Sequence, residues 1–227
     1  MKETIVIGLA GVKESGKSTA ANMLKVMLRD VHEVAFADKL KNVAAEVFYV
    51  PRLSFDDQRV KEKSLDHPRI LDADHIAQII HMFNANEKAT PEVVKKLEGL
   101  VGMVLDTPRK IAQIVGTEIL RLLGTDIHCE NVVLDQSKIN IVSDLRFENE
   151  FEFFNNKEDI KFIPLYISRD MAEAKVGPDS HSSETSVFLF NQKCIEIDNN
   201  HSLLYTANQL RNVLERNMLI IDGNSLM

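Results

Sequence analysis

The 227-residue chain contains no tryptophan and only two cysteines, Cys129 and Cys194. Two cysteines without a C-x-x-C pair are too few for a disulfide framework, which fits a reduced, cytoplasmic setting. No apolar run approaches the roughly 18 residues of a membrane span, and the seven histidines stand at no zinc-ligand spacing. These absences exclude a disulfide-rich secreted scaffold and argue against a membrane protein and against a structural zinc site.

Basic residues are also in the minority, because 27 Lys and Arg stand against 34 Asp and Glu, for a net charge of -7. This balance argues against binding duplex nucleic acid through a broad basic face, although a local cationic pocket for a small anion is compatible with it. Hydrophobic residues make up 44% and charged residues 27%, so the chain is expected to fold around a sizeable core. Its expected partners are small molecules, without nucleic acid or membrane.

Short apolar runs alternate with segments of helical periodicity along most of the chain. The expected strands are 4–9, 34–36, 139–142, 162–167 and 194–197. The expected helices are 18–29, 38–47, 107–123, 148–154 and 202–216. Repeated β-α-β units of this kind predict a three-layer α/β fold with a five-stranded parallel sheet between helices.

Residues 52–106 interrupt this alternation. The stretch 52–69 mixes both charge signs and is expected to be a loop, whereas 72–83 and 91–101 show short helical patterns. Asp72 is the expected N-cap of the first of these helices. We therefore interpret 1–227 as a single domain that carries a helical insert, or mobile lobe, at about 52–106.

The strongest motif is a loop between the first expected strand and helix. Residues 11–18, Gly-Val-Lys-Glu-Ser-Gly-Lys-Ser, match G-x-x-x-x-G-K-[ST] in the strand–loop–helix context that this motif requires. Its glycines let backbone N–H groups converge on phosphate oxygens, and the helix N-terminus adds a favourable dipole. Lys17 can reach the β- and γ-phosphates, and the Ser18 hydroxyl can ligate Mg²⁺. The motif predicts nucleotide binding, but kinases, GTPases, motors and nucleotide sensors all share it.

Charged residues follow the expected strand 139–142. Asp144 lies near the carboxyl end of a parallel strand, where ligands bind in open α/β sheets, and could hold a Mg²⁺-bound water or orient a substrate oxygen. Arg146 could meet a phosphate with two parallel hydrogen bonds, and Glu150 lies one helical turn further on. The alternative is an ordinary Asp–Arg pair on a surface turn.

The helix that begins at Thr107-Pro108 has two contrasting faces. At about 100° per residue, one arc is apolar. The opposite arc holds Arg109, Lys110, Gln113, Gly116, Thr117 and Arg121. A mid-helix glycine costs about 1 kcal/mol relative to alanine, which makes sense if something flat approaches the backbone at Gly116. This arc is either a second anion site or a plain exposed face.

A cationic loop follows the fourth expected strand. It holds Arg169, Lys175, Gly177 and Pro178 and continues into the sequence His-Ser-Ser-Glu at 181–184. Residues 169–184 are expected to form a lid that closes over phosphates, with a plain polar loop as the alternative.

Taken in order, these segments resemble the bacteriophage deoxynucleoside monophosphate kinases. The segments are the phosphate loop, 36–41 (Phe-Ala-Asp-Lys-Leu-Lys), 113–121, 143–150 (Ser-Asp-Leu-Arg-Phe-Glu-Asn-Glu) and 181–184. The resemblance covers most of the chain apart from 52–106 and the tail. It implies a P-loop kinase fold with a helical acceptor-binding insert that transfers the ATP γ-phosphate to a deoxynucleoside monophosphate with Mg²⁺. The expected location is the cytoplasm, which for a protein of phage origin is that of the host. A homodimer is left open.

The resemblance also implies roles for individual residues. Expected at ATP are Gly11, Lys13, Ser15, Gly16, Lys17, Ser18 and Thr19. Expected at the acceptor nucleotide are Asp38, Lys41, Arg109, Lys110, Gln113, Gly116, Thr117, Arg146 and Glu150. The implied catalytic residues are Lys17, Arg109, Asp144 and Arg146, and the implied metal ligands are Ser18 and Asp144.

The chain departs from the family at 127–129, which reads Ile-His-Cys where the family often has a tryptophan. This departure leaves the base preference open. Two other functions compete with the first: a kinase for another phosphorylated acceptor, dephospho-coenzyme A or phosphomevalonate, and a nucleotide sensor without transferase activity. The polar arc of the Pro108 helix favours an enzyme, because a pure sensor needs no second anion site.

Overall fold

The computed structural model describes residues 3–57, 59–177, 185–221 and 224–225. The chain divides into two compact units. The sheet unit comprises the residues up to Ala35 and those from Val133 onward, and the helical unit comprises Phe36–Val132. Among the described residues, no helix is long and apolar enough to cross a membrane.

A five-stranded sheet forms the centre of the sheet unit, in the order β2-β5-β1-β6-β7, and every pairing within it is parallel. Its strands are β1 (Thr4–Ala10), β2 (Val31–Val34), β5 (Ile139–Leu145), β6 (Ile160–Ser168) and β7 (Ile195–Asp198). The central strand β1 is buried almost throughout, as expected for a strand with neighbours on both edges and helices on both faces. The predicted parallel α/β fold is confirmed, and it is consistent with a P-loop kinase fold.

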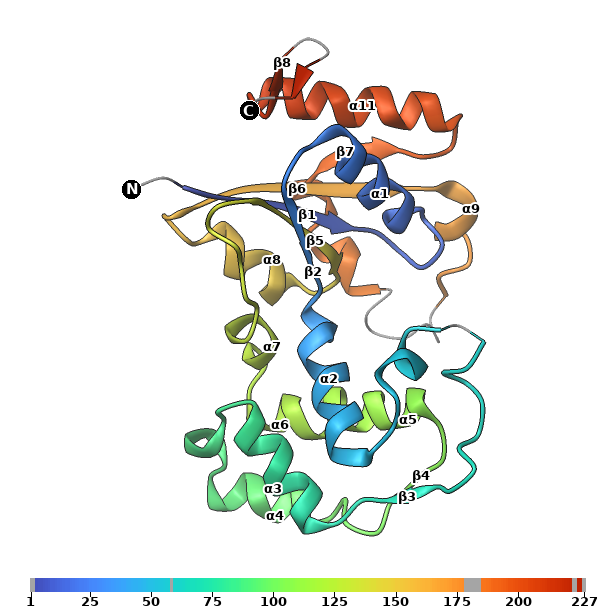
Figure 1. Ribbon diagram of the computed structural model, residues 1–227, viewed down its shortest axis with the longest axis vertical. Coiled ribbons are helices and arrows are strands. Elements are labelled where there is room, and N and C mark those ends of the chain that lie inside the picture. The colour runs from blue at the N-terminus through green and yellow to red at the C-terminus, as the bar shows by residue number, and fades with distance from the viewer. Residues whose placement is uncertain (1–2, 58, 178–184, 222–223, 226–227) are drawn as a thin grey trace. The chain divides into compact units, whose positions relative to one another are not determined.

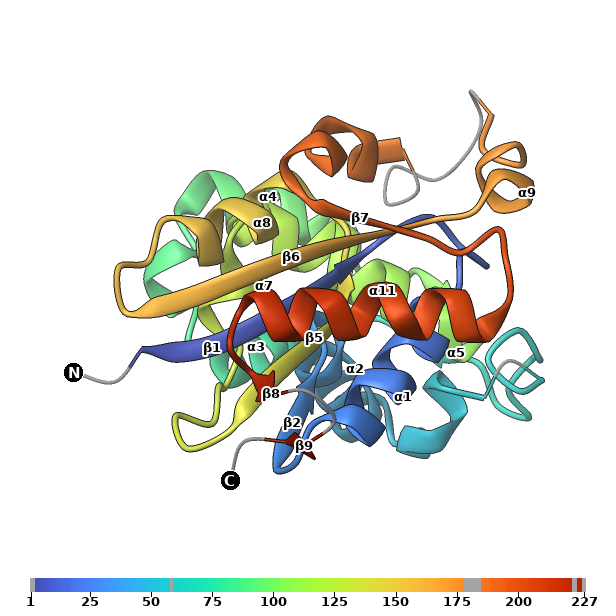
Figure 2. The same cartoon turned by 90° about the horizontal axis from the view of Figure 1, so that it is seen from above.

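Helices cover both faces of this sheet (Figures 1 and 2). One face carries α1 (Lys17–Met27) and α11 (Leu203–Arg216), whose Leu24 and Leu210 are buried in one hydrophobic cluster with Ile7 and Leu9 of β1. The other face carries α8 (Glu148–Asn155), where Phe151 and Phe154 meet Phe162 of β6 in an aromatic cluster. The shorter helices of this unit are α9 (Asp170–Glu173) and the 3₁₀ turns Ser186–Leu189 and Asn191–Lys193.

The sequence expectation for the second strand was wrong. The second strand is Val31–Val34 rather than 34–36, because Val31–Val34 pair with Ile139–Val142 of β5, and Phe36 already begins α2. A three-residue apolar run has no periodicity of its own, so its sequence cannot distinguish strand from helix. Near the C-terminus, β8 (Ile220–Ile221) pairs antiparallel with β9 (Asn224–Ser225).

The helical unit has its own buried hydrophobic core, and α2 is its longest helix. Its helices are α2 (Phe36–Phe48), α3 (Ala73–Met82), α4 (Pro91–Glu98), α5 (Pro108–Gln113), α6 (Arg121–Leu123) and α7 (Ile127–Glu130). Its short elements are the 3₁₀ turns Arg52–Phe55 and Asn86–Lys88 and the strands β3 (Arg69–Ile70) and β4 (Val104–Leu105). Asp72 caps α3 by accepting the His75 N–H at 2.8 Å, as predicted, and Thr90 caps α4.

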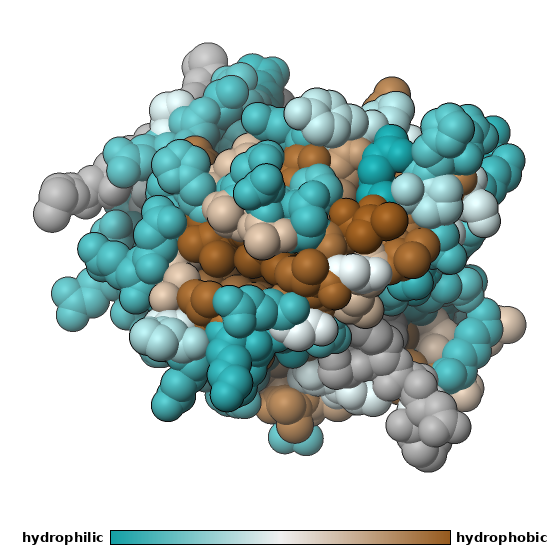
Figure 3. Space-filling model, turned by 90° about the horizontal axis from the view of Figure 1, so that it is seen from below, coloured by the Kyte–Doolittle hydropathy of each residue, from teal (hydrophilic) through white to brown (hydrophobic). Residues whose placement is uncertain are grey.

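The antiparallel pair β3–β4, which the sequence pattern did not indicate, has one buried and one exposed face. Leu105 is fully buried, whereas Ile70 and Val104, which face each other across the pair, are exposed. This alternation is the normal consequence of the strand pleat. Hydrophobic side chains gather in a band on the face shown in Figure 3. The large hydrophobic residues of the helical unit that stay exposed are Tyr49, Leu53, Ile70, Val94, Val101 and Val104.

Candidate functional site

The loop between β1 and α1 turns through three residues with positive φ angles. Gly11, Glu14 and Gly16 have φ angles of 147°, 66° and 106°, in the region that favours glycine. A Cβ on Gly11 would lie 2.7 Å from the carbonyl oxygen of Ile167, so only glycine fits there. Gly16 is the N-cap of α1 and provides no side chain to satisfy the first N–H groups of the helix. These N–H donors and the helix dipole therefore remain available to an anion.

The Lys17 side chain folds back onto the backbone of this loop. Its Nζ donates hydrogen bonds to the carbonyl oxygens of Gly11 at 2.6 Å and Val12 at 2.7 Å. Ser18 and Thr19, the next two residues of α1, are exposed, as is Lys13. The hydroxyl of Ser15 is fully buried and, within the described part of the chain, is the buried side-chain polar atom that has no hydrogen-bond partner. A buried hydroxyl without a partner and a glycine-lined turn both fit a polyphosphate chain.

A β-bulge places Asp144 beside the start of the phosphate loop. Gly8 pairs with Val142 but Ala10 pairs with Leu145, so Ser143 and Asp144 together stand opposite a single residue of β1. Bulges re-aim side chains, and they are common next to functional sites. The sequence predicted that β5 ends at Val142; the strand instead continues to Leu145, because the bulge absorbs the extra residue.

Glu150 holds the turn that carries Arg146. Its Oε2 accepts the backbone N–H of Arg146 at 2.8 Å and that of Phe147 at 3.0 Å, at the start of α8. Glu150 is only 5% exposed. Burial raises the pKa of its carboxyl to about 8, and the negative charge of Asp144 adds to this rise. The contacts of Glu150 are thus those of a residue that shapes the turn.

The Pro108 helix has the two faces that its sequence predicts. Thr107 caps it by accepting the Lys110 N–H at 3.1 Å, and Pro108 takes the first helical position. The apolar arc is buried at Ile111, Ile114, Val115 and Ile119. On the polar arc Arg109, Gln113, Thr117 and Arg121 are exposed, and Lys110 and Gly116 are half-buried.

The middle of this helix is π-helical from Ile114 to Leu120, which the sequence pattern did not predict. π-Helical segments are rare in proteins, and those that occur often lie at functional sites. A Cβ on Gly116 would lie 2.6 Å from Cδ1 of Leu40, so the glycine permits close packing against α2. His128 makes a hydrogen bond to the Gly116 backbone, and burial is the main cause of its lowered pKa. The close approach at Gly116 is therefore made by the protein itself, from Leu40.

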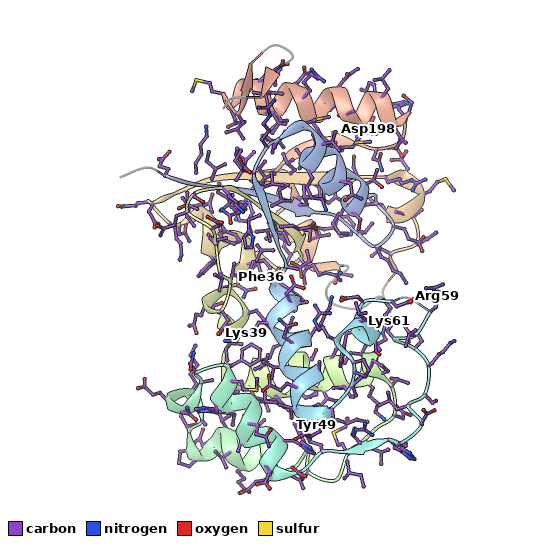
Figure 4. The ribbon with its side chains drawn as sticks, in the orientation of Figure 1. Phe36, Lys39, Tyr49, Arg59, Lys61 and Asp198 are labelled. Carbon is purple, nitrogen blue, oxygen red and sulfur yellow. The ribbon has the colours of Figure 1, made fainter. Side chains whose placement is uncertain are left out.

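The predicted acceptor-binding cations of the helical unit are paired with carboxylates. Arg109 pairs with Glu62, and Lys41 pairs with Asp56 at 2.8 Å. Arg52 bridges Asp56 and Asp38, with 3.1 Å between its Nη2 and the Asp38 carboxylate. Lys110 lies 3.8 Å from Asp106. These exposed pairs are individually weak, so an incoming phosphate can compete with the carboxylates for the cations. Figure 4 labels Phe36, where α2 begins, and Lys39 on the same helix.

The structure distributes the predicted site residues over both units. The phosphate loop, Asp144, Arg146 and Glu150 belong to the sheet unit, whereas Asp38, Lys41 and the polar arc of the Pro108 helix belong to the helical unit. From the expected lid, Arg169 donates to the Glu14 carbonyl at 3.3 Å and Lys175 pairs with the Glu14 carboxylate. This pairing lowers the pKa of Glu14. The remainder of that loop, including Pro178 and 181–184, lies outside the described residues.

The chain is similar over most of its length to a viral protein. The chain is 27% identical over 217 residues to a protein of Acanthamoeba polyphaga mimivirus named "Putative deoxynucleotide monophosphate kinase". The match covers 85% of this chain and 91% of the viral protein. No protein-family model matches the chain. At this level of identity, the similarity supports a relationship to kinases and no finer assignment.

Proposed function

We propose that the protein transfers the γ-phosphoryl group of ATP to a deoxynucleoside monophosphate, giving ADP and a deoxynucleoside diphosphate. An oxygen of the acceptor phosphate bonds to the γ-phosphorus, the bond to the β,γ-bridging oxygen breaks, and ADP leaves with those electrons. The observation that supports this proposal most is the glycine-lined loop between β1 and α1, with the Lys17 amine lying across its carbonyls. The similarity to the viral protein and the parallel sheet agree with it.

The chain's own residues would act mainly by alignment and charge, because phosphoryl transfer requires little covalent chemistry from the protein. Lys17 would exchange the carbonyls of Gly11 and Val12 for β- and γ-phosphate oxygens. Arg146 would neutralise charge on the transferring group, and Arg169 and Lys175 would contribute from the lid. Asp144, aimed by the bulge, would orient the acceptor oxygen or a metal-bound water.

The residues present fit a magnesium ion that is held largely by the nucleotide. Mg²⁺, when bound, neutralises phosphate charge. Ser18 offers an exposed hydroxyl at the start of α1, and Asp144 offers a carboxylate at the end of β5. Among the described residues, no group of three or more His, Cys, Asp or Glu side chains could hold a metal ion. One or two protein ligands supplemented by phosphate oxygens and water are what Mg²⁺ usually takes.

On this proposal the acceptor monophosphate binds the polar arc of the Pro108 helix. Arg109 would bind the phosphate, because it is the first residue of the polar arc and a guanidinium can form two parallel hydrogen bonds to phosphate oxygens. Asp38, Lys41, Gln113 and Thr117 would contact the rest of the nucleotide. Gly116 would serve this surface indirectly, by allowing Leu40 to pack against the helix.

An acceptor panel tests the proposed function. Coupled ADP release is measured with ATP and Mg²⁺ while deoxynucleoside monophosphates, ribonucleoside monophosphates, dephospho-coenzyme A and phosphomevalonate are supplied in turn. We expect the largest stimulation by one or more deoxynucleoside monophosphates. Stimulation by dephospho-coenzyme A or phosphomevalonate alone would assign another acceptor. ATP binding without stimulation by any acceptor would make the protein a nucleotide sensor.

A further inference from the structure

Asn199 connects the end of the sheet to the back of the phosphate loop. It follows β7 directly, next to Asp198, which Figure 4 shows near α11. The side-chain Nδ2 of Asn199 donates to the carbonyl oxygen of Ser15 at 2.7 Å, across 184 positions of sequence. Its backbone N–H donates to the Ser168 carbonyl at 2.9 Å, which anchors it at the end of β6. Asn199 thus bridges two strand ends and the loop.

A buried hydroxyl fixes the orientation of the Asn199 amide. Thr206 of α11, only 2% exposed, donates from Oγ1 to Oδ1 of Asn199 at 2.9 Å. With Oδ1 engaged as an acceptor, the amide presents its NH₂ group, and not its oxygen, to Ser15. Asn199 is also in close contact with Gly16, since a Cβ at that position would lie 2.2 Å from Nδ2.

The bond to Ser15 determines where an N–H group of the loop points. A trans peptide is planar, and its C=O and N–H point in opposite directions. When Asn199 holds the Ser15 carbonyl, it therefore directs the N–H of Gly16 away from itself. Gly16 is the N-cap of α1, so this N–H belongs to the donors that an anion at the loop would meet.

We propose that Asn199 is a positioning residue for the donor nucleotide: it holds the Ser15–Gly16 peptide in the orientation in which the loop receives phosphate. The inference rests on the proposed function insofar as it takes this loop to be the ATP site. It assigns Asn199 no contact with the nucleotide. Removing its amide should therefore weaken ATP binding and leave the binding of the acceptor unchanged.

Asn199→Ala and Asn200→Ala form the matched pair of variants. Asn200 is the next residue, and its amide bonds Asp170 and Asp198 rather than the phosphate loop. We expect Asn199→Ala to weaken ATP affinity, measured by titration calorimetry with Mg²⁺, by several-fold and at most about tenfold, since one lost hydrogen bond is worth up to about 1.5 kcal/mol. Asn199→Asp should lose at least as much, because it places a carboxylate oxygen against the Ser15 carbonyl. Asn200→Ala should change ATP affinity less than about twofold, and the KM for the acceptor should stay constant in all three variants.

A double-mutant cycle provides a readout that does not depend on catalysis. Gly16→Ala introduces the Cβ that collides with Nδ2, in addition to the strain of its φ angle. In thermal unfolding, Gly16→Ala should therefore lower Tm less in the Asn199→Ala background than in the wild type. If Asn199→Ala does not fold, Thr206→Val replaces it in the affinity comparison, because it retains the Asn199 amide and removes only the hydroxyl that orients it.

Equal ATP affinities in Asn199→Ala and Asn200→Ala, or additive effects in the cycle, would overturn the inference. Its failure is distinguishable from failure of the proposed function. If the wild type binds ATP but phosphorylates no nucleotide, the proposed function falls and the affinity ratio still decides the role of Asn199. If the wild type binds no ATP, both fall together.

Discussion

The carboxylate of Glu150 accepts the backbone N–H of Arg146, 2.8 Å away, from within the first turn of the following helix. The family resemblance implied that both residues contact the acceptor nucleotide. In the structure, one of them holds the backbone of the other. Because the carboxylate is buried and shared with the Phe147 N–H, its loss would leave two donors of the turn without that acceptor.

This relationship predicts that Glu150→Gln is milder than Glu150→Met. Both replacements have nearly the volume of glutamate, but only glutamine keeps an acceptor oxygen for the two N–H groups. We expect Glu150→Met to lower the free energy of unfolding by about 1–3 kcal/mol more than Glu150→Gln, in urea denaturation. Equal losses in the two variants would mean that the hydrogen bonds to this turn contribute little to stability.

Gly116 and Leu40 should be strongly coupled. In a helix, alanine is favoured over glycine by about 1 kcal/mol, but the new Cβ would collide with the Leu40 side chain, and overpacking of this kind costs about 1–3 kcal/mol. We expect Gly116→Ala to destabilise the wild type and to stabilise the Leu40→Ala variant, in thermal unfolding. The same sign in both backgrounds would show that Leu40 is not the reason for the glycine.

His128 predicts a pH dependence of stability. Burial lowers its pKa in the folded state below the usual value of about 6.5, so the unfolded chain binds the proton more readily. The stabilisation due to neutral His128 is therefore fully present above about pH 6.5 and is lost as the pH falls through the folded-state value. His128→Gln, which cannot titrate, should flatten the fall in unfolding free energy between pH 7 and pH 5. The matched control is His201→Gln, at an exposed position, and a similar flattening there would contradict the assignment.

Arg109→Ala tests the acceptor surface of the Pro108 helix. A charge-assisted contact to phosphate is worth about 1.5–3 kcal/mol, so kcat/KM for the deoxynucleoside monophosphate should fall at least about tenfold, with the KM for ATP unchanged. Arg59→Ala is the control, because Arg59, which is labelled in Figure 4, is an exposed arginine of the same unit. It pairs with Asp57. If Arg109→Ala impairs the use of ATP and of the acceptor equally, Arg109 acts at the ATP site. If neither changes, the polar arc is an ordinary solvated surface.

Features encoded by local pattern were predictable from the sequence. The strand–loop–helix around Lys17, the parallel sheet and the buried arc of the Pro108 helix all follow from short-range periodicity and glycine placement. Features that depend on contacts between residues far apart in the sequence were not predictable. Asn199 meets Ser15 across 184 positions. The bulge at Asp144 depends on the register between β1 and β5, and Gly116 is explained by Leu40 of another helix.

The proposed phosphoryl transfer is tested by measuring the deoxynucleoside diphosphate formed when the protein is given ATP, Mg²⁺ and a deoxynucleoside monophosphate. Both products are quantified by ion-exchange chromatography, and Lys17→Ala, checked for an unchanged circular dichroism spectrum, is run in parallel. We predict one diphosphate for each ADP with the wild type and none with Lys17→Ala. ADP formed without deoxynucleoside diphosphate would show that the protein is not this kinase, and near-normal transfer by folded Lys17→Ala would show that the loop between β1 and α1 is not its ATP site.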